Sequence, residues 1–190
     1  VTAGTSSEYS GFGGIVGELA GGSILESSHS AATVEGTRGV GGLTGRNNSS
    51  TVRDSYFTGS ASATVGYLGG VAGQSTGDLQ RTYSIGRLAA GSDTVTFIGP
   101  IAGEIYAVGR TVAGNFWNAD TAGSLDQGGR SGLLGIATRQ MIDYATFRDA
   151  GWDFVSESAN GTADVWDMDQ GDSLNAGFPI LAWQQGADLV

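Results

Sequence analysis

Three acidic residues near the C-terminus have the types and spacing of a cation site. The segment 167–172 reads Asp-Met-Asp-Gln-Gly-Asp, which places Asp167, Asp169 and Asp172 around a glycine turn. Calcium requires several hard oxygens that converge from one loop, so this segment is a candidate calcium site. The glutamate that closes the usual calcium loop is missing, and the same residues also describe a polar turn after Trp166. No cofactor other than this calcium ion is expected.

The four tryptophans are a second candidate site, and all of them lie from residue 117 onward. Tryptophan rings offer a large flat apolar face with a polar edge, which suits stacking on a pyranose ring. The sequence therefore presents Trp117, Trp152, Trp166 and Trp183 as a candidate sugar-binding platform. The competing interpretation is that these rings cover the open end of the fold, because terminal repeats need a cap.

Residues suited to catalysis are sparse. The chain has one histidine, His29, no cysteine and no lysine, which excludes two-histidine metal motifs and thiolate chemistry. No Gly-x-Ser-x-Gly turn frames a serine that would act with His29 and Asp54. The acidic candidates for glycosidase or lyase chemistry do not recur at equivalent positions; they are Glu18, Glu26, Glu35, Asp54, Asp78 and Glu104. We therefore expect no enzymatic activity.

Composition narrows the class of protein. The 190 residues include 34 glycines but 2 prolines, and 19 acidic residues against 9 basic ones give a net charge of −10. Such acidity argues against nucleic acid and anionic membrane surfaces as partners. No apolar run approaches the ~20 residues of a membrane helix. The chain starts at Val1 and has no signal-peptide pattern, which predicts a processed chain or one cut from a longer protein. We expect it to be secreted.

Internal repeats dominate the first part of the chain. Each repeat opens with the pattern x, apolar, Gly, Gly, apolar, small, Gly, although Pro100 replaces the second glycine of the last one. The spacing between successive repeats is 28, 28 and 30 residues. The four segments are 11–17, 39–45, 67–73 and 97–103. Short apolar stretches follow each segment, separated by Gly, Ser and Asn, so each repeat predicts three short strands.

A repeat of this size is about one coil of a β-solenoid, and stacking is needed because one coil cannot bury its own apolar face. We predict a right-handed, all-β solenoid of about four ~28-residue repeats, with strands of adjacent coils ~4.8 Å apart. Equivalent apolar residues should form interior ladders. The predicted ladders are Phe12/Val40/Leu68/Ile98, Ile15/Leu43/Val71/Ile101 and Ile24/Val52/Leu79/Val112.

The Gly-Gly-apolar-x-Gly blocks, each followed by an apolar-x-x-Ser-Tyr/Phe stretch, resemble GLUG-motif repeats. The resemblance covers roughly residues 11–117. GLUG repeats occur in large bacterial surface proteins, including filamentous-haemagglutinin-like adhesins. The resemblance therefore implies a β-solenoid and a place at the cell surface. Asn118 follows Trp117 where the related proteins usually have Asp, which weakens any role for a carboxylate there.

Two domains are predicted: GLUG-like repeats over 1–117 and a capping region with one short helix over 118–190. Thr138 is the expected helix N-cap, and Gly151 the expected end. Residues 1–10 are short and polar and offer no matching cap, so further repeats or another subunit should stack on the first coil.

The leading functional hypothesis is a structural and adhesive module, a rigid stalk or tip of a secreted surface protein, with a cell-surface or matrix glycan as its partner. The alternative is a subunit of an extracellular filament that assembles head-to-tail. A carbohydrate-active enzyme on a β-helix scaffold is a weaker alternative. An ice-binding face is weaker still, since it would need a flat threonine ladder such as Thr33, Thr64 and Thr94.

Overall fold

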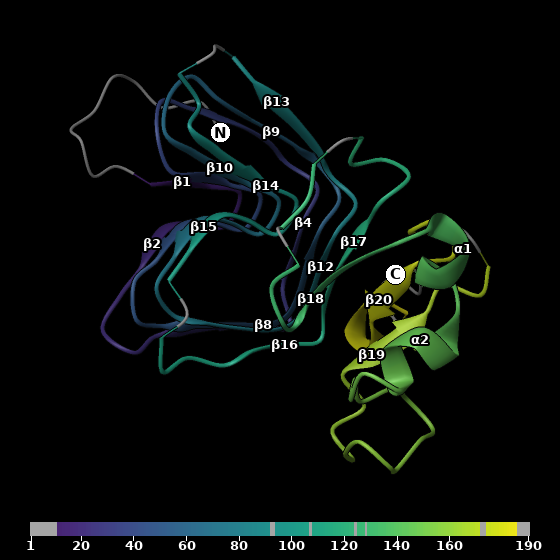
Figure 1. Ribbon diagram of the computed structural model, residues 1–190. Helices are drawn as coiled ribbons and strands as arrows, with labels where there is room; N and C mark the ends of the chain where they lie inside the picture. The colour runs from purple at the N-terminus through teal and green to yellow at the C-terminus, as the bar shows by residue number, and fades with distance from the viewer. Residues whose placement is uncertain are drawn as a thin grey trace. The chain divides into compact units, whose positions relative to one another are not determined.

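The computed structural model describes residues 11–91, 94–106, 108–123, 125–127, 129–171 and 174–185. The chain divides into two compact units, Val1–Gly135 and Ile136–Val190. The first unit is a parallel β-solenoid with strands β1 to β18, most of which are labelled in Figure 1. It extends past the predicted boundary at residue 117 because β18 (Leu133–Ile136) lies beside β17 (Asn115–Asn118) in the same sheet.

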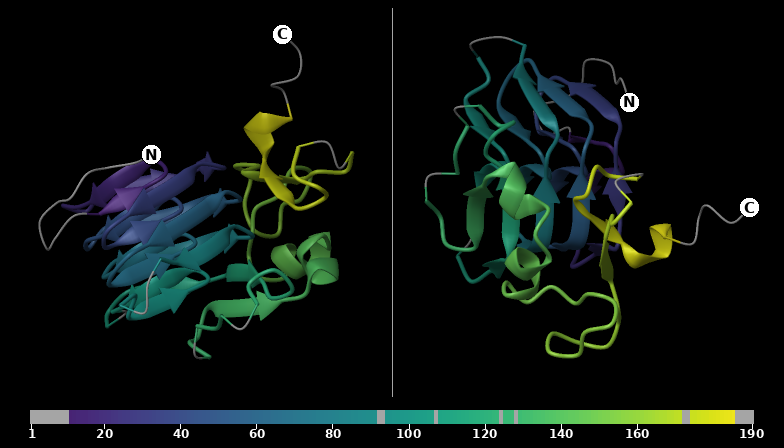
Figure 2. Two further views of the ribbon diagram at one scale, coloured as in Figure 1. Left: turned by 90° about the horizontal axis from the view of Figure 1, so that it is seen from above. Right: turned by 90° about the vertical axis from the view of Figure 1, so that its right-hand side faces the viewer.

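Four parallel sheets make the sides of the solenoid, and Figure 2 shows their strands stacked coil upon coil. The first sheet contains β1 (Phe12–Gly13), β6 (Val40–Gly41), β10 (Tyr67–Gly69) and β14 (Phe97–Gly99). The second sheet contains β2 (Val16–Leu19), β7 (Thr44–Asn47), β11 (Ala72–Ser75) and β15 (Ala102–Ile105).

The third sheet contains β3 (Ile24–Glu26), β8 (Thr51–Phe57), β12 (Asp78–Ser84), β17 and β18, and β4 (His29–Ser30) and β16 (Val112–Ala113) also pair with it. The fourth sheet contains β5 (Thr33–Gly36), β9 (Ser60–Ala63) and β13 (Arg87–Ala90). The solenoid therefore has three complete coils, starting at Gly11, Gly39 and Tyr67, and an incomplete fourth that starts at Phe97. Each repeat is one coil, with more strands than the three predicted.

The predicted register of the first two ladders is confirmed, although Ile15, the first member of the second ladder, is exposed and not interior. Phe12 pairs with Val40, Val40 with Leu68, and Leu68 with Ile98. At the next corner, the amides of Ile15, Leu43 and Val71 each donate to the equivalent residue of the following coil, at 3.0, 3.0 and 2.7 Å. Apolar side chains from all three complete coils form one continuous core. The solenoid is therefore built by stacking identical positions, as the repeat spacing predicts.

The third ladder is correct from Val52 to Val112 but wrong at its first member. Leu25, not Ile24, pairs with Val52, and Ile24 pairs with Thr51. Ile24 is 54 % exposed as a result. The predicted offset of 28 residues fails here because the third sheet repeats every 27 residues in the first coils, so the register slips by one and the side chain changes face.

The glycines of the repeat motif let the first and second sheets touch through their backbones. A Cβ at Gly73 would lie 2.5 Å from the carbonyl carbon of Gly39, and one at Gly103 would lie 2.6 Å from the amide nitrogen of Leu68. Real Cβ atoms do not approach so closely, so only glycine fits. The motif thus folds back on itself, and its first and last residues lie opposite each other.

A bulge recurs in the third sheet and was not predicted. Ser27, Asp54 and Arg81 take left-handed backbone conformations with φ of 47°, 48° and 49°. The Arg81 guanidinium donates two hydrogen bonds to the Asp54 carboxylate, from Nε to Oδ1 at 2.6 Å and from Nη2 to Oδ2 at 2.7 Å. In the fourth coil Gly114 has φ of 65°, and the buried Asn115 side chain bonds Thr82 and the carbonyl of Leu79. Polar side chains thereby satisfy backbone groups that the bulge leaves without ladder partners.

The chain itself covers the C-terminal edge of the solenoid. The buried Gln127 carbonyl oxygen accepts hydrogen bonds from the amides of Ile101 and Ala102, at 3.0 and 2.7 Å. The Arg130 guanidinium donates to the carbonyl of Ile105 at 3.0 Å. These backbone groups belong to the last coil, and no further coil of the described residues forms hydrogen bonds with them. The capping function expected of the tryptophan-rich region is thus carried out, at this edge, by residues before 136.

The second unit has its own small core. Its elements are α1 (Thr138–Met141), α2 (Tyr144–Arg148), the antiparallel pair β19 (Trp166–Met168) and β20 (Pro179–Leu181), and a 3-10 turn, η1 (Ala182–Gln184). Two short helices replace the single helix expected, because the chain leaves helical geometry at Ile142 and Asp143. The first helix is preceded by Ala137, not capped by Thr138, and the Asp143 carboxylate caps the second by accepting from the Ala145 amide at 3.0 Å.

Candidate functional site

Three of the four tryptophans are buried side chains. Trp152 and Trp166 are 0 % exposed and pack against each other with ring centroids 4.3 Å apart. Trp117 is 5 % exposed and belongs to the solenoid core. These three rings have no free face for a sugar, so the platform predicted from them is corrected to core packing. Trp183, at 57 % exposure, is the member of the set that offers a surface.

The acidic segment forms a backbone turn. Asp169 is 2 % exposed, and one of its carboxylate oxygens accepts from the amides of Leu174, Asn175 and Gly177 at 3.0, 2.6 and 3.4 Å. Asp167 accepts from the Met168 amide at 2.8 Å, and Asp172 lies outside the described residues. Among the residues that the structure describes, no three acidic or histidine side chains gather to hold a metal ion. The Asp169 carboxylate therefore stabilises the turn by accepting hydrogen bonds from backbone amides.

The carboxylates considered for catalysis are mostly paired between neighbouring coils. Glu26 binds Arg53, and Glu18 lies 3.9 Å from Arg46. Asp54 is held by Arg81 as described above. Asp78 accepts from the Thr111 amide at 2.8 Å. Glu26, Asp54 and Asp78 lie on the third sheet and Glu18 on the second, and none of them lines the pocket described below.

His29 and the threonines also take structural positions. The His29 imidazole stacks on Tyr56, which stacks on Tyr83, with centroids 4.8 Å apart in both pairs. Burial lowers the pKa of His29 and favours the neutral ring. Thr33 pairs with Ser60, so the threonine ladder considered for ice binding is interrupted at the second coil.

An exposed cluster that sequence reasoning missed lies where the first and second sheets meet. We call it the aromatic face, and it consists of Tyr67, Gln74, Phe97, Glu104 and Tyr106. Tyr67 and Phe97 are register partners in β10 and β14, and their rings stack with centroids 5.4 Å apart and planes 17° apart. Phe97 is 42 % exposed and Tyr106 is 53 % exposed.

The Glu104 carboxylate organises the polar side of the aromatic face. One of its oxygens accepts from the Gln74 amide at 2.9 Å, and the other accepts from the Tyr106 hydroxyl at 2.7 Å. The hydrogen bond to Glu104 raises the pKa of Tyr106, and burial followed by the Glu104 charge raises the pKa of Tyr67. Both phenols therefore keep their protons well above neutral pH, and both oxygens retain lone pairs for a ligand.

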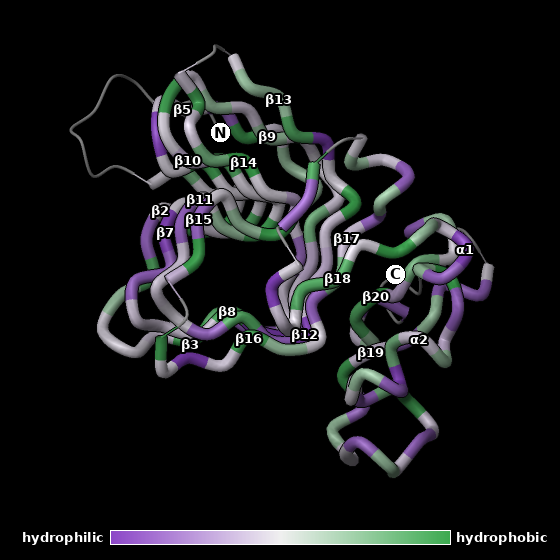
Figure 3. Tube along the Cα trace, viewed as in Figure 1, coloured by the Kyte–Doolittle hydropathy of each residue, from purple (hydrophilic) through white to green (hydrophobic). Residues whose placement is uncertain are grey.

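The aromatic face exists because the repeat motif folds back on itself. Its first position holds Tyr67 and Phe97 in the third and fourth coils, but Gly11 and Gly39 in the first two. The residue just after the motif is Gln74 in the third coil and Glu104 in the fourth, and these two pair in register. The sequence signal was the replacement of glycine by an aromatic residue in later repeats. Figure 3 shows hydrophilic positions along the second sheet beside it.

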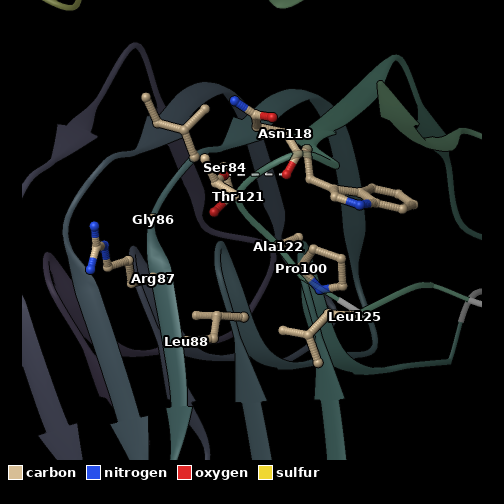
Figure 4. Close-up of a pocket in the computed structure, with 11 residues that line it drawn as sticks. Ser84, Gly86, Arg87, Leu88, Pro100, Asn118, Thr121, Ala122 and Leu125 are labelled. Atoms are coloured by element: carbon tan, nitrogen blue, oxygen red, sulfur yellow. Dashed lines mark hydrogen bonds between the residues drawn. The ribbon is translucent and has the colours of Figure 1, made fainter. Parts of the chain in front are cut away.

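A pocket of about 510 Å³ lies at the C-terminal end of the solenoid (Figure 4). Apolar side chains, including Leu88, Pro100 and Leu125, line one part, and Ser84, Asn118 and Thr121 line another. In Figure 4 the Arg87 side chain stands at the pocket's margin. The Thr121 hydroxyl bonds the carbonyl of Asn118 at 3.3 Å. Arg87 is the one ionisable residue among the described residues that line the pocket.

Comparison with known proteins gives one informative match. A protein of Evansella cellulosilytica that carries the provisional name Gly-rich membrane protein is 36 % identical over 113 residues, which are 57 % of this chain and 12 % of that protein. The chain therefore spans about an eighth of that relative. No family model matches the chain, and no solved structure matches it. None of the helices in the described residues is both long enough and apolar enough to cross a bilayer.

Proposed function

We propose that this chain is a structural and adhesive module of a secreted bacterial surface protein, of the kind built from GLUG repeats. In this role it is a rigid segment that stacks in series with another solenoid coil and presents a ligand-binding face. The match to a stretch of a much longer protein named as a membrane protein supports a place within a larger surface assembly.

The observation that carries this proposal is the difference between the two ends of the solenoid. At one position of the repeat, Leu43, Val71 and Ile101 are 0 % exposed, whereas Ile15 in the first coil is 42 % exposed. Within the described residues, β1, β2, β3 and β5 are terminal strands of their sheets. Unpaired strand edges with apolar side chains are normally covered in proteins. We call this surface the first-coil edge.

The opposite end favours a module in series over a head-to-tail filament. A filament would need the C-terminal edge of one copy to pair with the first-coil edge of the next. Gln127 and Arg130 already occupy backbone groups of that C-terminal edge. The first-coil edge is therefore the place at which a further coil would add.

An added coil tests the proposal. A copy of residues 39–66 inserted before Gly11 supplies one more repeat with the native spacing. The expected result is a higher midpoint of thermal unfolding, because each coil interface adds stability. The matched control carries valine at the inserted copy of Gly42, where a Cβ would overlap the carbonyl oxygen of the next coil. Equal midpoints for the native chain, the extended chain and the control would contradict the proposal.

A further inference from the structure

We infer that the aromatic face, formed by Tyr67, Gln74, Phe97, Glu104 and Tyr106, is a binding site for uncharged polysaccharides. The inference deepens the proposed adhesive role and rests on it. It replaces the tryptophan platform, whose rings are mostly buried, with a set of side chains that the fold leaves at the surface.

The two stacked rings provide the apolar part of the site. Tyr67 and Phe97 lie almost parallel, 17° apart, and come from adjacent coils of one rigid sheet. Their backbone positions are set by ladder pairing, and the backbone of Gly103 in the adjoining sheet packs closely against Leu68 and Phe97. Each ring covers one face of the other, so the outward face of the stacked pair and the ring edges are what a ligand can contact. Aromatic surfaces that are fixed before binding lose little conformational entropy, which favours contact with the C–H groups of a sugar ring.

The polar groups beside the rings match sugar hydroxyls. Glu104 is held by Gln74 and Tyr106, at 2.9 and 2.7 Å, so its carboxylate has a set orientation before any ligand arrives. A carboxylate accepts strong hydrogen bonds from neutral donors, and hydroxyl pairs of sugars are such donors. The phenol oxygens of Tyr67 and Tyr106 can accept further hydrogen bonds.

Charge selects the class of sugar. The Glu104 carboxylate stands at the centre of the site, and the positive charges of Arg38 and Arg46 also act on Tyr67, so charges of both signs meet there. The net charge of −10 on the whole chain disfavours acidic polysaccharides at longer range, and neutral ones are favoured.

Affinity gel electrophoresis of the whole chain tests the inference, with hydroxyethyl cellulose, galactomannan and glycol chitin as neutral probes and alginate as an acidic one. We expect retardation in at least one neutral gel and none in alginate. Phe97→Ala and Tyr67→Ala should each weaken binding about tenfold, which corresponds to about 1.4 kcal/mol. Glu104→Gln should weaken it while the rings remain in place.

Trp183→Ala is the matched control, since it removes an exposed aromatic ring in the other unit. It should bind like the native chain, and circular dichroism should show that all variants are folded. Binding that is lost in Trp183→Ala but kept in the face variants would overturn this site while leaving an adhesive role. No retardation in any neutral gel, or retardation in alginate, would overturn the inference; the added-coil experiment would still decide the structural role.

Discussion

A pair of alanine substitutions at one repeat position measures how open the first-coil edge is. Leu43 and Ile15 occupy the same position in adjacent coils, and the Ile15 amide donates to the Leu43 carbonyl at 3.0 Å. Leu43 is fully buried, whereas Ile15 is 42 % exposed. Each substitution removes three carbons, so the comparison holds the chemistry nearly constant and varies the burial.

The two substitutions are expected to lower the free energy of unfolding by amounts that differ by more than the error of a urea-unfolding measurement. For Leu43→Ala, three buried carbons at about 0.8 kcal/mol each give about 2.4 kcal/mol, and the enclosed cavity raises this to about 2.5–4 kcal/mol. For Ile15→Ala, the same sum scaled to the buried fraction gives roughly 1.4 kcal/mol, without a cavity because the site is open. In the chain with the added coil, the cost of Ile15→Ala should rise to that of Leu43→Ala.

Urea unfolding gives both values. Far-UV circular dichroism follows the solenoid, and tryptophan fluorescence mainly follows the second unit, where Trp152 and Trp166 are buried. The reasoning is refuted if Ile15→Ala and Leu43→Ala cost the same in the native chain. That result would mean that the first-coil edge is already covered.

Three further predictions concern single residues. Gln127→Leu leaves two backbone amides without their acceptor and should cost about 2–5 kcal/mol in urea unfolding; a loss under about 1 kcal/mol contradicts the capping account. His29→Phe keeps the aromatic stack on Tyr56. Because the pKa of His29 is lower in the folded chain than in the unfolded one, the unfolding free energy of the native chain should fall more than that of the variant as pH drops below about 6.5. Parallel curves of unfolding free energy against pH would contradict this. Asp169→Ala should lower the midpoint of the second unit equally in calcium and in EDTA, because amides satisfy the carboxylate; a calcium-dependent midpoint in the native chain would restore the metal hypothesis.

The solenoid itself could be predicted because its signal repeats. Glycines at fixed positions and apolar residues between them specify which sides touch, and two of the three predicted ladders have the predicted register throughout, with Ile15 alone exposed at the first coil. The third slipped at Ile24 because the loop between the second and third sheets is one residue longer in the first coil, from Leu19 to Leu25, than in the second, from Asn47 to Val52. Register depends on loop length as well as on the apolar pattern, and the sequence marks loop length less clearly.

The candidate site was harder to predict because residue type does not reveal burial. Tryptophan is common both in sugar sites and in cores, and here the ring pair of Trp152 and Trp166 supplies the core of a small unit. Asp169 likewise looks like a ligand but serves backbone amides. Tyr67 and Glu104 lie 37 positions apart in the chain, and only the folded motif brings them together.

Hydrogen exchange in the first coil, followed by mass spectrometry, tests the central claim most directly. In the native chain, amides of β2 and β3 should exchange much faster than those of β7 and β8, their equivalents one coil inward. In the chain with the added coil, β2 and β3 should become as slow as β7 and β8. Slow exchange of β2 and β3 in the native chain, or no slowing after the coil is added, would contradict a first-coil edge built to receive another coil.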